Sequence, residues 1–251
     1  MTMFAFDMIP DEVLRLRRLI CRIGRLMRQF GYIDGGSGNI SARLGPDRIL
    51  ITPSGPAKGF MKPDQLIVID MDGRKVGEPT AANRDLQPSS ETPMHLECYR
   101  LREDVGGVVH AHPPNAVALT IAGISLAQCV VPEVVVLMGL VPTAPYATPA
   151  SVEDRDAIRD LIPFHDALML SHHGSLTVGP DVWTAYLRLE TLEHYANILL
   201  RVSQLGEPRP LQPDQIAKLL DLRQQLGLMR AIDHELFARY VGTAAPPDMA
   251  E

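Results

Sequence analysis

The chain has 251 residues, of which 46% are hydrophobic and 22% are charged, proportions typical of a globular protein with a substantial core. Its net charge of −6 argues against nucleic acid as a partner, because binding a phosphate backbone requires a basic surface. The three cysteines form no CxxC pair, which indicates a reduced, cytoplasmic protein rather than a disulfide scaffold.

One uncharged stretch, residues 113–132, is long enough to suggest a membrane span. Prolines bound it at both ends, however, and polar residues such as Asn115 and Gln128 interrupt it. A buried helix followed by a buried strand explains the stretch better. The N-terminal ten residues lack the basic region of a signal peptide. The sequence therefore predicts a soluble protein without membrane contact.

The N-terminal part begins with an amphipathic helix. Apolar residues recur at three- and four-residue spacing from Val13 to Met27, which predicts a helix over residues 11–30. A glycine-rich turn over residues 34–39 follows, with many backbone N–H groups. Strands are then expected over residues 49–52 and 66–70, followed by a helix over residues 91–100 that Ser90 caps.

The second half alternates apolar strand-like runs with helical patterns. The expected elements are strand 107–110, helix 115–122, strands near 128–131 and 134–137, helix 154–161, strand 167–170, and helices 180–205, 214–226 and 230–240. The last ten residues are expected to fray. Such alternation favours one α/β domain over residues 1–205, with residues 206–251 as its helical C-terminal extension.

Histidines follow two of these predicted strands. His110 and His112 are two residues apart on a strand and therefore point to the same face, so both imidazoles can converge on one cation. His-x-His alone also fits histidines that are simply hydrogen-bonded or on the surface. A second strand ends at His172 and His173, which should face opposite ways, so only one of them is expected to be a ligand.

Glu91 has two interpretations from its position alone. It either supplies the carboxylate that usually completes a catalytic set of imidazoles, or only complements the dipole of the helix that it begins. The other histidines, His95, His165, His194 and His234, are interpreted as surface or core residues.

Six segments, taken in order, resemble the class II aldolase/adducin family. They are Gly38-Asn39-Ile40-Ser41, Thr52-Pro53-Ser54-Gly55, Ser89-Ser90-Glu91, His110-Ala111-His112, Ala144-Pro145-Tyr146-Ala147-Thr148 and His172-His173-Gly174. The resemblance extends over about residues 11–205. It implies a three-layer α/β/α fold with a central, largely antiparallel sheet, and a homotetramer with active sites at the subunit interfaces.

The resemblance also implies a site. Metal ligands fall on His110, His112 and His173, and the residue that both binds the metal and acts as acid and base falls on Glu91. One divalent ion per subunit is expected, zinc first, with manganese, iron or cobalt as alternatives. The family's phosphate cradle maps onto Asn39, Ser54, Gly55, Ser89 and Ser90, whose amide, hydroxyl and backbone N–H groups suit a phosphate or a carboxylate.

The activity that the resemblance implies is reversible retro-aldol cleavage of a small ketose phosphate to dihydroxyacetone phosphate and an aldehyde, through an enediolate. The chain departs from the family's aldolases in the stretch Cys129–Val134, which lacks their proton-donating tyrosine; Glu133 is the nearest residue able to handle a proton. The alternatives are a metal-dependent decarboxylase of a hydroxylated aromatic or oxo acid, a sugar-phosphate epimerase, and a non-catalytic adducin-like module.

Overall fold

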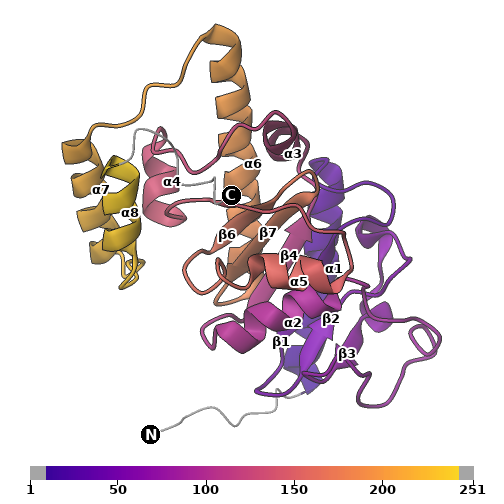
Figure 1. Ribbon diagram of the computed structural model, residues 1–251. Helices are drawn as coiled ribbons and strands as arrows, with labels where there is room; N and C mark the ends of the chain where they lie inside the picture. Colours follow the sequence, from indigo (N-terminus) through magenta and orange to yellow (C-terminus); the bar gives the residue numbers. More distant parts are fainter. Residues whose placement is uncertain (1–9, 243–251) are drawn as a thin grey trace, which may run out of the picture.

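The computed structural model describes residues 10–242 and is built around one seven-stranded sheet (Figure 1). The strand order is β3-β2-β1-β4-β7-β6-β5, and every neighbouring pair is antiparallel except β5 with β6. The strands are β1 Asn39–Arg43, β2 Ile49–Ile51, β3 Ile67–Ile69, β4 Gly107–Ala111, β5 Thr143–Ala144, β6 Ala167–Leu170 and β7 Gly174–Gly179.

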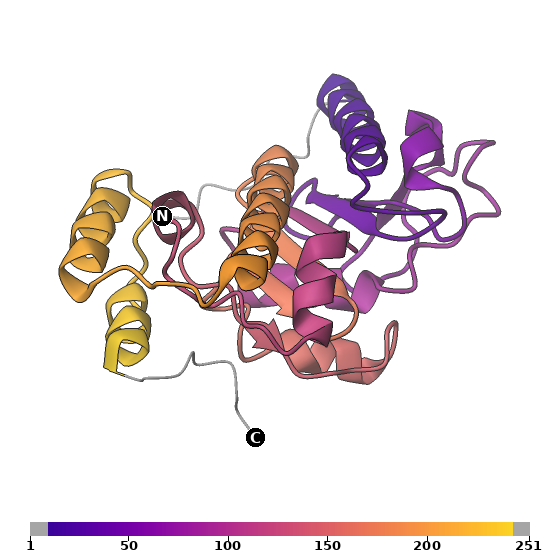
Figure 2. The ribbon, with the colours of Figure 1, turned by 90° about the horizontal axis from the view of Figure 1, so that it is seen from above.

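Helices cover both faces of this sheet, which gives three layers (Figure 2). The α-helices are α1 Pro10–Gln29, α2 Thr92–Leu101, α3 Pro114–Ile121, α4 Pro132–Leu137, α5 Val152–Ile158, α6 Val182–Leu205, α7 Pro213–Gln225 and α8 Asp233–Gly242, with short 3-10 turns η1 Lys58–Phe60 and η2 Pro63–Gln65. One face packs against α1 and α6 and the other against α2 and α5. The predicted three-layer, largely antiparallel fold is confirmed.

Strand β4 at the centre shows how the alternation of side chains divides the core. Val109 and Ala111 pack with α1 and α6, whereas Val108 packs on the opposite face with α2. Because alternate residues of a strand share a face, His110 lies on the side of Val108, toward α2. Burial on both faces also explains why β4 consists almost entirely of apolar residues.

The two strands predicted near residues 128–131 and 134–137 are wrong. No strand forms over 128–131, and the valine-rich segment is helix α4. Pro132 occupies its first turn, where a missing N–H does no harm. Val135 packs against Ile216, Leu220 and Phe237 of the C-terminal helices. Tertiary burial here outweighs the preference of valine for strands, which is weak and depends on context.

Strand β7 was not predicted, and it changes how the sheet is arranged. The two predicted strands that end in histidine, β4 and β6, are not neighbours, because β7 lies between them. His172 and His173 therefore belong to the tight turn from β6 to β7. The turn returns the chain beside β4, where Ser175 pairs with Ala111.

The C-terminal helices pack against α4 rather than on the sheet (Figures 1 and 2). The buried Arg223 of α7 ties this group together, because its Nε donates to Asp233 (2.8 Å) and its NH1 group donates to the carbonyl oxygen of Val136 (2.7 Å). The division of the chain at residue 205 stays a prediction. The fraying expected for the last ten residues concerns positions that lie outside the described part, except for residue 242.

Candidate active site

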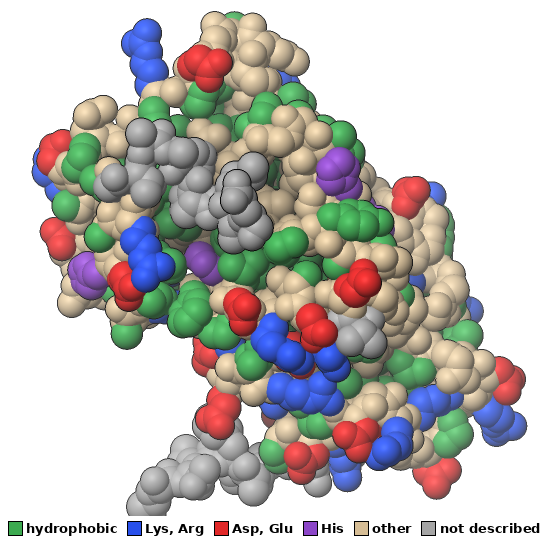
Figure 3. All heavy atoms as spheres, viewed as in Figure 1, with side chains coloured by type: hydrophobic (Ala, Val, Ile, Leu, Met, Phe, Trp, Pro, Cys, Tyr) green, Lys and Arg blue, Asp and Glu red, His purple; other side chains and the backbone are tan. Residues whose placement is uncertain are grey.

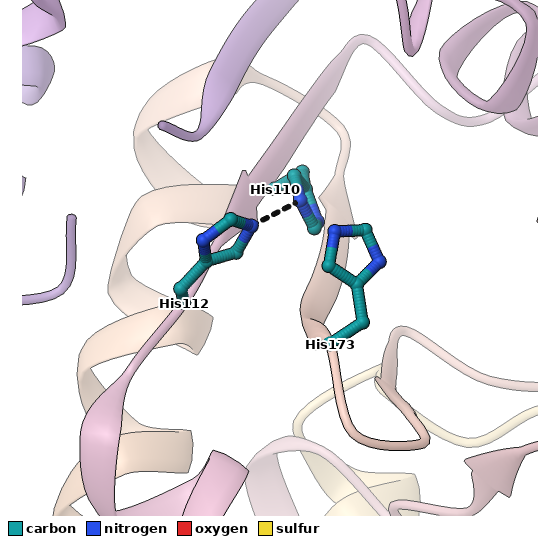
Figure 4. A group of neighbouring side chains, drawn as sticks. All are labelled: His110, His112 and His173. Atoms are coloured by element: carbon teal, nitrogen blue, oxygen red, sulfur yellow. Dashed lines mark hydrogen bonds between the residues drawn. The ribbon is translucent and has the colours of Figure 1, made fainter. Parts of the chain in front are cut away.

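Three histidines converge near the ends of the central strands (Figure 4). His110 lies in β4, His112 lies just beyond that strand, and His173 lies in the β6–β7 turn. Their ring centroids are 4.8, 4.9 and 5.0 Å apart, and His110 Nε2 lies 3.0 Å from His112 Nε2. One ligand nitrogen from each ring lies within 4.8 Å of the others, an arrangement that could hold a metal ion.

The sequence-adjacent histidines separate in space. His172 adopts a φ of 59°, in the left-handed region that few non-glycine residues occupy. Its ring lies against that of Tyr146, with centroids 6.4 Å apart, whereas His173 faces His110. Only one of the pair joins the cluster, as the sequence argument expected. The separation arises within a turn, however, and not from the alternation of a strand.

Gly174 allows the turn to approach β4 this closely. A Cβ atom on Gly174 would lie 2.4 Å from the carbonyl oxygen of Ala111, 2.8 Å from His112 Cδ2 and 3.0 Å from His110 Cε1. Any side chain at this position would therefore force the turn, and with it His173, away from the other two histidines.

Glu91 presents its carboxylate to the same cluster. It is the N-cap residue of α2, but its side chain makes no capping hydrogen bond. Oε1 lies 3.3 Å from His173 Nε2, and Oε2 lies 3.4 Å from His110 Nε2. Oε2 also accepts a hydrogen bond of 2.5 Å from Asn39 Nδ2. Of the two interpretations of Glu91, the structure favours the carboxylate that faces the histidines.

The protonation of the cluster follows from its hydrogen bonds. His110 Nδ1 lies 2.9 Å from the carbonyl oxygen of Ser175, which can only accept, so this nitrogen donates. Burial lowers the pKa of His110 to about 3 and keeps the ring neutral, although the charge of Glu91 opposes this shift. His110 Nε2 therefore turns a lone pair toward the centre of the site.

Glu91 is ionised at neutral pH. Burial alone would raise the pKa of its carboxyl group, but the neighbouring His110 and His173 and the amide of Asn39 outweigh burial and hold that pKa well below its usual range. The Glu91 carboxylate and the rings of His110, His112 and His173 thus gather around one point. Carboxylate and imidazole groups are the ligands of zinc, iron and manganese sites, so the cluster has the ligand chemistry that such an ion requires.

The distances agree with such an ion. Two ligands bound tetrahedrally at about 2.0–2.1 Å from one zinc ion lie roughly 3.3 Å apart. Three separations between ligand atoms of the cluster, 3.0, 3.3 and 3.4 Å, are close to this value, and the three ring nitrogens all lie within 4.8 Å of one another. The residues therefore fit a divalent metal, without distinguishing among the metals that accept imidazole and carboxylate.

The residues expected to cradle an anion lie on two loops that the fold brings together. Ser54 N donates to the carbonyl oxygen of Gln87 (2.9 Å), and Ser89 N donates to that of Thr52 (3.2 Å). Ser54, Gly55 and Ser90 are exposed, while Ser89 is buried. Gly55 has a φ of 92°, which suits a glycine loop whose backbone approaches a ligand. Asn39 joins the site differently, through its bond to Glu91.

Glu133 lies apart from this cluster. It is exposed in the first turn of α4, and no contact found within residues 10–242 links it to the three histidines. Tyr146, from a different motif, is 64% exposed beside His172.

Sequence reasoning missed three buried polar residues around the site. His95, interpreted as an ordinary surface or core residue, is fully buried and bonded to Asn39. Lys58 is buried with its Nζ donating to the carbonyl oxygens of Gly36 and Pro56. Asp154 is only 3% exposed. For His95 a signal existed, because it follows Glu91 by four residues and so shares its side of a helix.

The comparisons with known proteins agree with this geometry. Residues 18–200 match the class II aldolase and adducin N-terminal domain. The chain belongs to the class II aldolase/adducin family. Its three-histidine cluster is consistent with the divalent metal site typical of class II aldolases.

Relatives of this family member include both aldolases and decarboxylases. The L-fuculose phosphate aldolase of Methanococcus maripaludis is 30% identical over 178 residues, which cover 70% of this chain and 92% of that protein. The 3,4-dihydroxyphthalate decarboxylase of Arthrobacter keyseri is 29% identical over 231 residues, covering 88% of this chain and 92% of that protein. A solved structure of L-fuculose 1-phosphate aldolase is 24% identical to this chain, with a TM-score of 0.76. The match covers 89% of this chain and 100% of that structure, and it supports the fold.

Two surface properties bear on possible partners. No helix within residues 10–242 is long and apolar enough to cross a membrane. On the face drawn in Figure 3, Lys and Arg side chains lie among Asp and Glu side chains and form no continuous basic surface. This face therefore offers no electrostatic footprint for nucleic acid.

Proposed function

We propose that the protein is a divalent-metal-dependent carbon–carbon lyase that cleaves a small ketose phosphate to dihydroxyacetone phosphate and an aldehyde. The observation that carries this proposal is the geometry of the Glu91 carboxylate, whose two oxygens face His110 and His173. We assign the metal ligands to Glu91, His110, His112 and His173. When bound, the ion would supply Lewis-acid stabilisation of the negative charge that develops on the substrate oxygen.

Glu91 moves the proton at carbon. In the synthetic direction it removes a proton from the hydroxymethyl carbon of dihydroxyacetone phosphate, and the electron pair of that bond passes to the carbonyl oxygen to give an enediolate. In the cleavage direction it returns the proton to the same carbon. An ionised carboxylate is the form needed to remove the proton, and general base assistance of this kind is typically worth ~10²–10⁴-fold in rate.

The remaining residues bind and orient the substrate. The hydroxyl groups of Ser54, Ser89 and Ser90 and the backbone N–H of Gly55 hold the phosphate, and Asn39 lies between this anion and Glu91. We assign to Glu133 the protonation of the aldehyde oxygen. Because Glu133 is exposed and lies apart from the histidines of its own chain, it would act in the site of a neighbouring subunit of a homotetramer.

A second candidate is decarboxylation of a hydroxylated aromatic or oxo di-acid, with the same loops holding a carboxylate. The segment Cys129–Val134 favours it, because this segment lacks the tyrosine of the family's aldolases. In sequence, the match to the phthalate decarboxylase spans 231 residues, against 178 for the Methanococcus maripaludis aldolase. A match of that length includes residues beyond 200, where the family domain ends and the C-terminal helices lie.

Isotope exchange separates the two candidates. The metal-loaded protein is incubated with dihydroxyacetone phosphate in D₂O, and the C3 proton signal is followed by NMR with and without a chelator. Chelator-sensitive loss of the signal would establish formation of the enediolate. A folded, metal-loaded protein that leaves the signal intact would contradict the aldolase, and release of carbon dioxide from hydroxylated di-acids would then be measured.

A further inference from the structure

A hydrogen-bonded network of buried polar side chains leads from Glu91 into the interior. Asn39 Nδ2 donates to Glu91 Oε2, and Asn39 Oδ1 lies 2.5 Å from His95 Nε2. His95 Nδ1 lies 2.6 Å from Ser41 Oγ, which lies 2.8 Å from the hydroxyl of Tyr99. Asn39, Ser41, His95 and Tyr99 are each no more than 2% exposed. This network is therefore isolated from solvent except at Glu91.

Two regular elements place these residues opposite each other. Asn39 and Ser41 are alternate residues of β1 and share a face of the sheet. Glu91, His95 and Tyr99 follow one another at four-residue spacing along α2, and so line one side of it. The two-residue spacing in β1 and the four-residue spacing in α2 place the hydrogen-bonding side chains of the two elements opposite one another.

The donor and the acceptor of each hydrogen bond in this network can be deduced. Ionised Glu91 can only accept, so the amide of Asn39 turns its NH₂ group to the carboxylate and its oxygen to His95. An amide oxygen can only accept, so His95 Nε2 carries the hydrogen. In a neutral ring, Nδ1 then accepts from Ser41, and Ser41 in turn accepts from Tyr99. Burial lowers the pKa of His95 to about 4, against the opposing charge of Glu91, and keeps the ring neutral.

We propose that His95 is a positioning residue, which acts through Asn39 to hold the Glu91 carboxylate toward His110 and His173. The inference rests on the proposed function, in which Glu91 binds the ion and moves the proton. Its physical basis is the amide of Asn39. Rotated by 180°, this group would turn its oxygen to the carboxylate and repel it. The N–H of His95 favours the productive orientation, because it bonds only to the oxygen.

The same orientation serves the substrate. The NH₂ group of Asn39 has two hydrogens, and Glu91 Oε2 takes one of them. In the proposed function, the second would donate to the anionic group of the substrate. In the proposed function, His95 would thus align a donor shared by Glu91 and the substrate, while its own ring bonds to Asn39 and not to the Glu91 carboxylate.

The tautomer of His95 is the first test. In the folded protein at pH 7, two-bond ¹H–¹⁵N correlation spectra should show His95 as a neutral ring with hydrogen on Nε2. A neutral ring with hydrogen on Nδ1 would overturn the proposal, because its Nε2 could not donate to the Asn39 oxygen.

Variants provide the second test, with zinc affinity measured by competition with a chromophoric chelator. His95→Leu removes both ring nitrogens and should weaken zinc binding and slow exchange of dihydroxyacetone phosphate by ~10–100-fold. His95→Gln keeps an amide N–H donor and should recover most of the loss. Equal losses in the two variants, or an unaltered His95→Leu protein, would refute a positioning role.

Two further variants serve as controls. Tyr195→Phe removes another buried tyrosine hydroxyl, which donates to the carbonyl oxygen of Gln128, and should leave zinc affinity and exchange unchanged. If His95→Leu does not fold, Ser41→Ala replaces it. Loss of that hydroxyl removes the donor to Nδ1, so the His95 spectrum should show mixed tautomers and zinc affinity should fall. A wild-type spectrum and wild-type affinity in this variant would contradict the proposal.

These measurements distinguish failure of the proposed aldolase activity from failure of the positioning role of His95. A wild-type protein that does not exchange dihydroxyacetone phosphate would contradict the proposed aldolase. Zinc affinity and the His95 tautomer need no substrate, and would still decide whether His95 positions Glu91.

Discussion

Asn39 lies directly opposite His110 in the antiparallel pairing of β1 with β4, and both side chains reach Glu91 Oε2. The amide donates to this oxygen at 2.5 Å, and the imidazole nitrogen lies 3.4 Å from it. The other oxygen, Oε1, faces His173. The register of two central strands thus sets both the orientation of the carboxylate and its proton affinity, which is why the site is built at this end of the sheet.

Replacing His112 with alanine should remove the metal and the activity together. The three imidazoles converge on one point, and the loss of one leaves an incomplete set of ligands. Elemental analysis of the purified variant would measure this, with His194→Ala as control because His194 is exposed on α6. Full metal occupancy in His112→Ala would refute the assigned ligands.

Glu91→Gln should retain the fold and lose turnover by about 10²–10⁴-fold. The glutamine has nearly the same shape but cannot accept a proton from carbon, and the hydrogen bond from Asn39 loses its charged acceptor. Circular dichroism would check the fold, and exchange of dihydroxyacetone phosphate would measure turnover. Near-normal exchange would remove Glu91 from the mechanism.

Asp154→Asn should stabilise the protein at neutral pH by roughly 1 kcal/mol. Asp154 is buried, its Oδ2 has no hydrogen-bond partner within the described residues, and burial, together with the charge of Glu91, raises the pKa of its carboxyl group. Because the folded pKa is raised, the protonated carboxyl favours folding at low pH, and this advantage disappears as pH rises through the folded pKa.

Chemical denaturation at several pH values checks this prediction. The difference in the free energy of unfolding between Asp154→Asn and wild type should be smallest near pH 4 and grow toward pH 7. A difference that does not depend on pH would mean that the charge of Asp154 is compensated in the folded protein.

Arg223→Ala should detach the C-terminal helices from α4. The variant leaves the buried Asp233 carboxylate and the carbonyl oxygen of Val136 without their donor, and breaking a buried ion pair in this way costs about 3–5 kcal/mol. Hydrogen exchange should increase in residues 213–242 and 132–137, with β4 still protected. Lys218→Ala, which removes an exposed pair with Asp214, is the matched control and should change little.

Local patterns were sufficient to predict the elements with a clear hydrophobic period. The spacing in α1 and the apolar run of β4 predicted their structure, and the alternation of a strand placed His110 and His112 on one side. Glycine, serine and histidine motifs, read in order, led to the correct family and to its three-layer fold. These properties are local, or are carried by short segments, and so are visible without coordinates.

Tertiary structure decided the rest. The valine-rich segment of α4 is helical because it is buried on two sides, with Val135 against the C-terminal helices and Val134 in the cluster that contains α3 and α6 residues, and no local pattern shows this burial. His173 reaches the cluster through a turn into β7, whose place between β4 and β6 depends on pairing between distant strands. His95 gains its position behind Glu91 only when α2 packs against β1. Each of these depends on contacts between segments far apart in the chain, which hydrophobic periodicity does not encode.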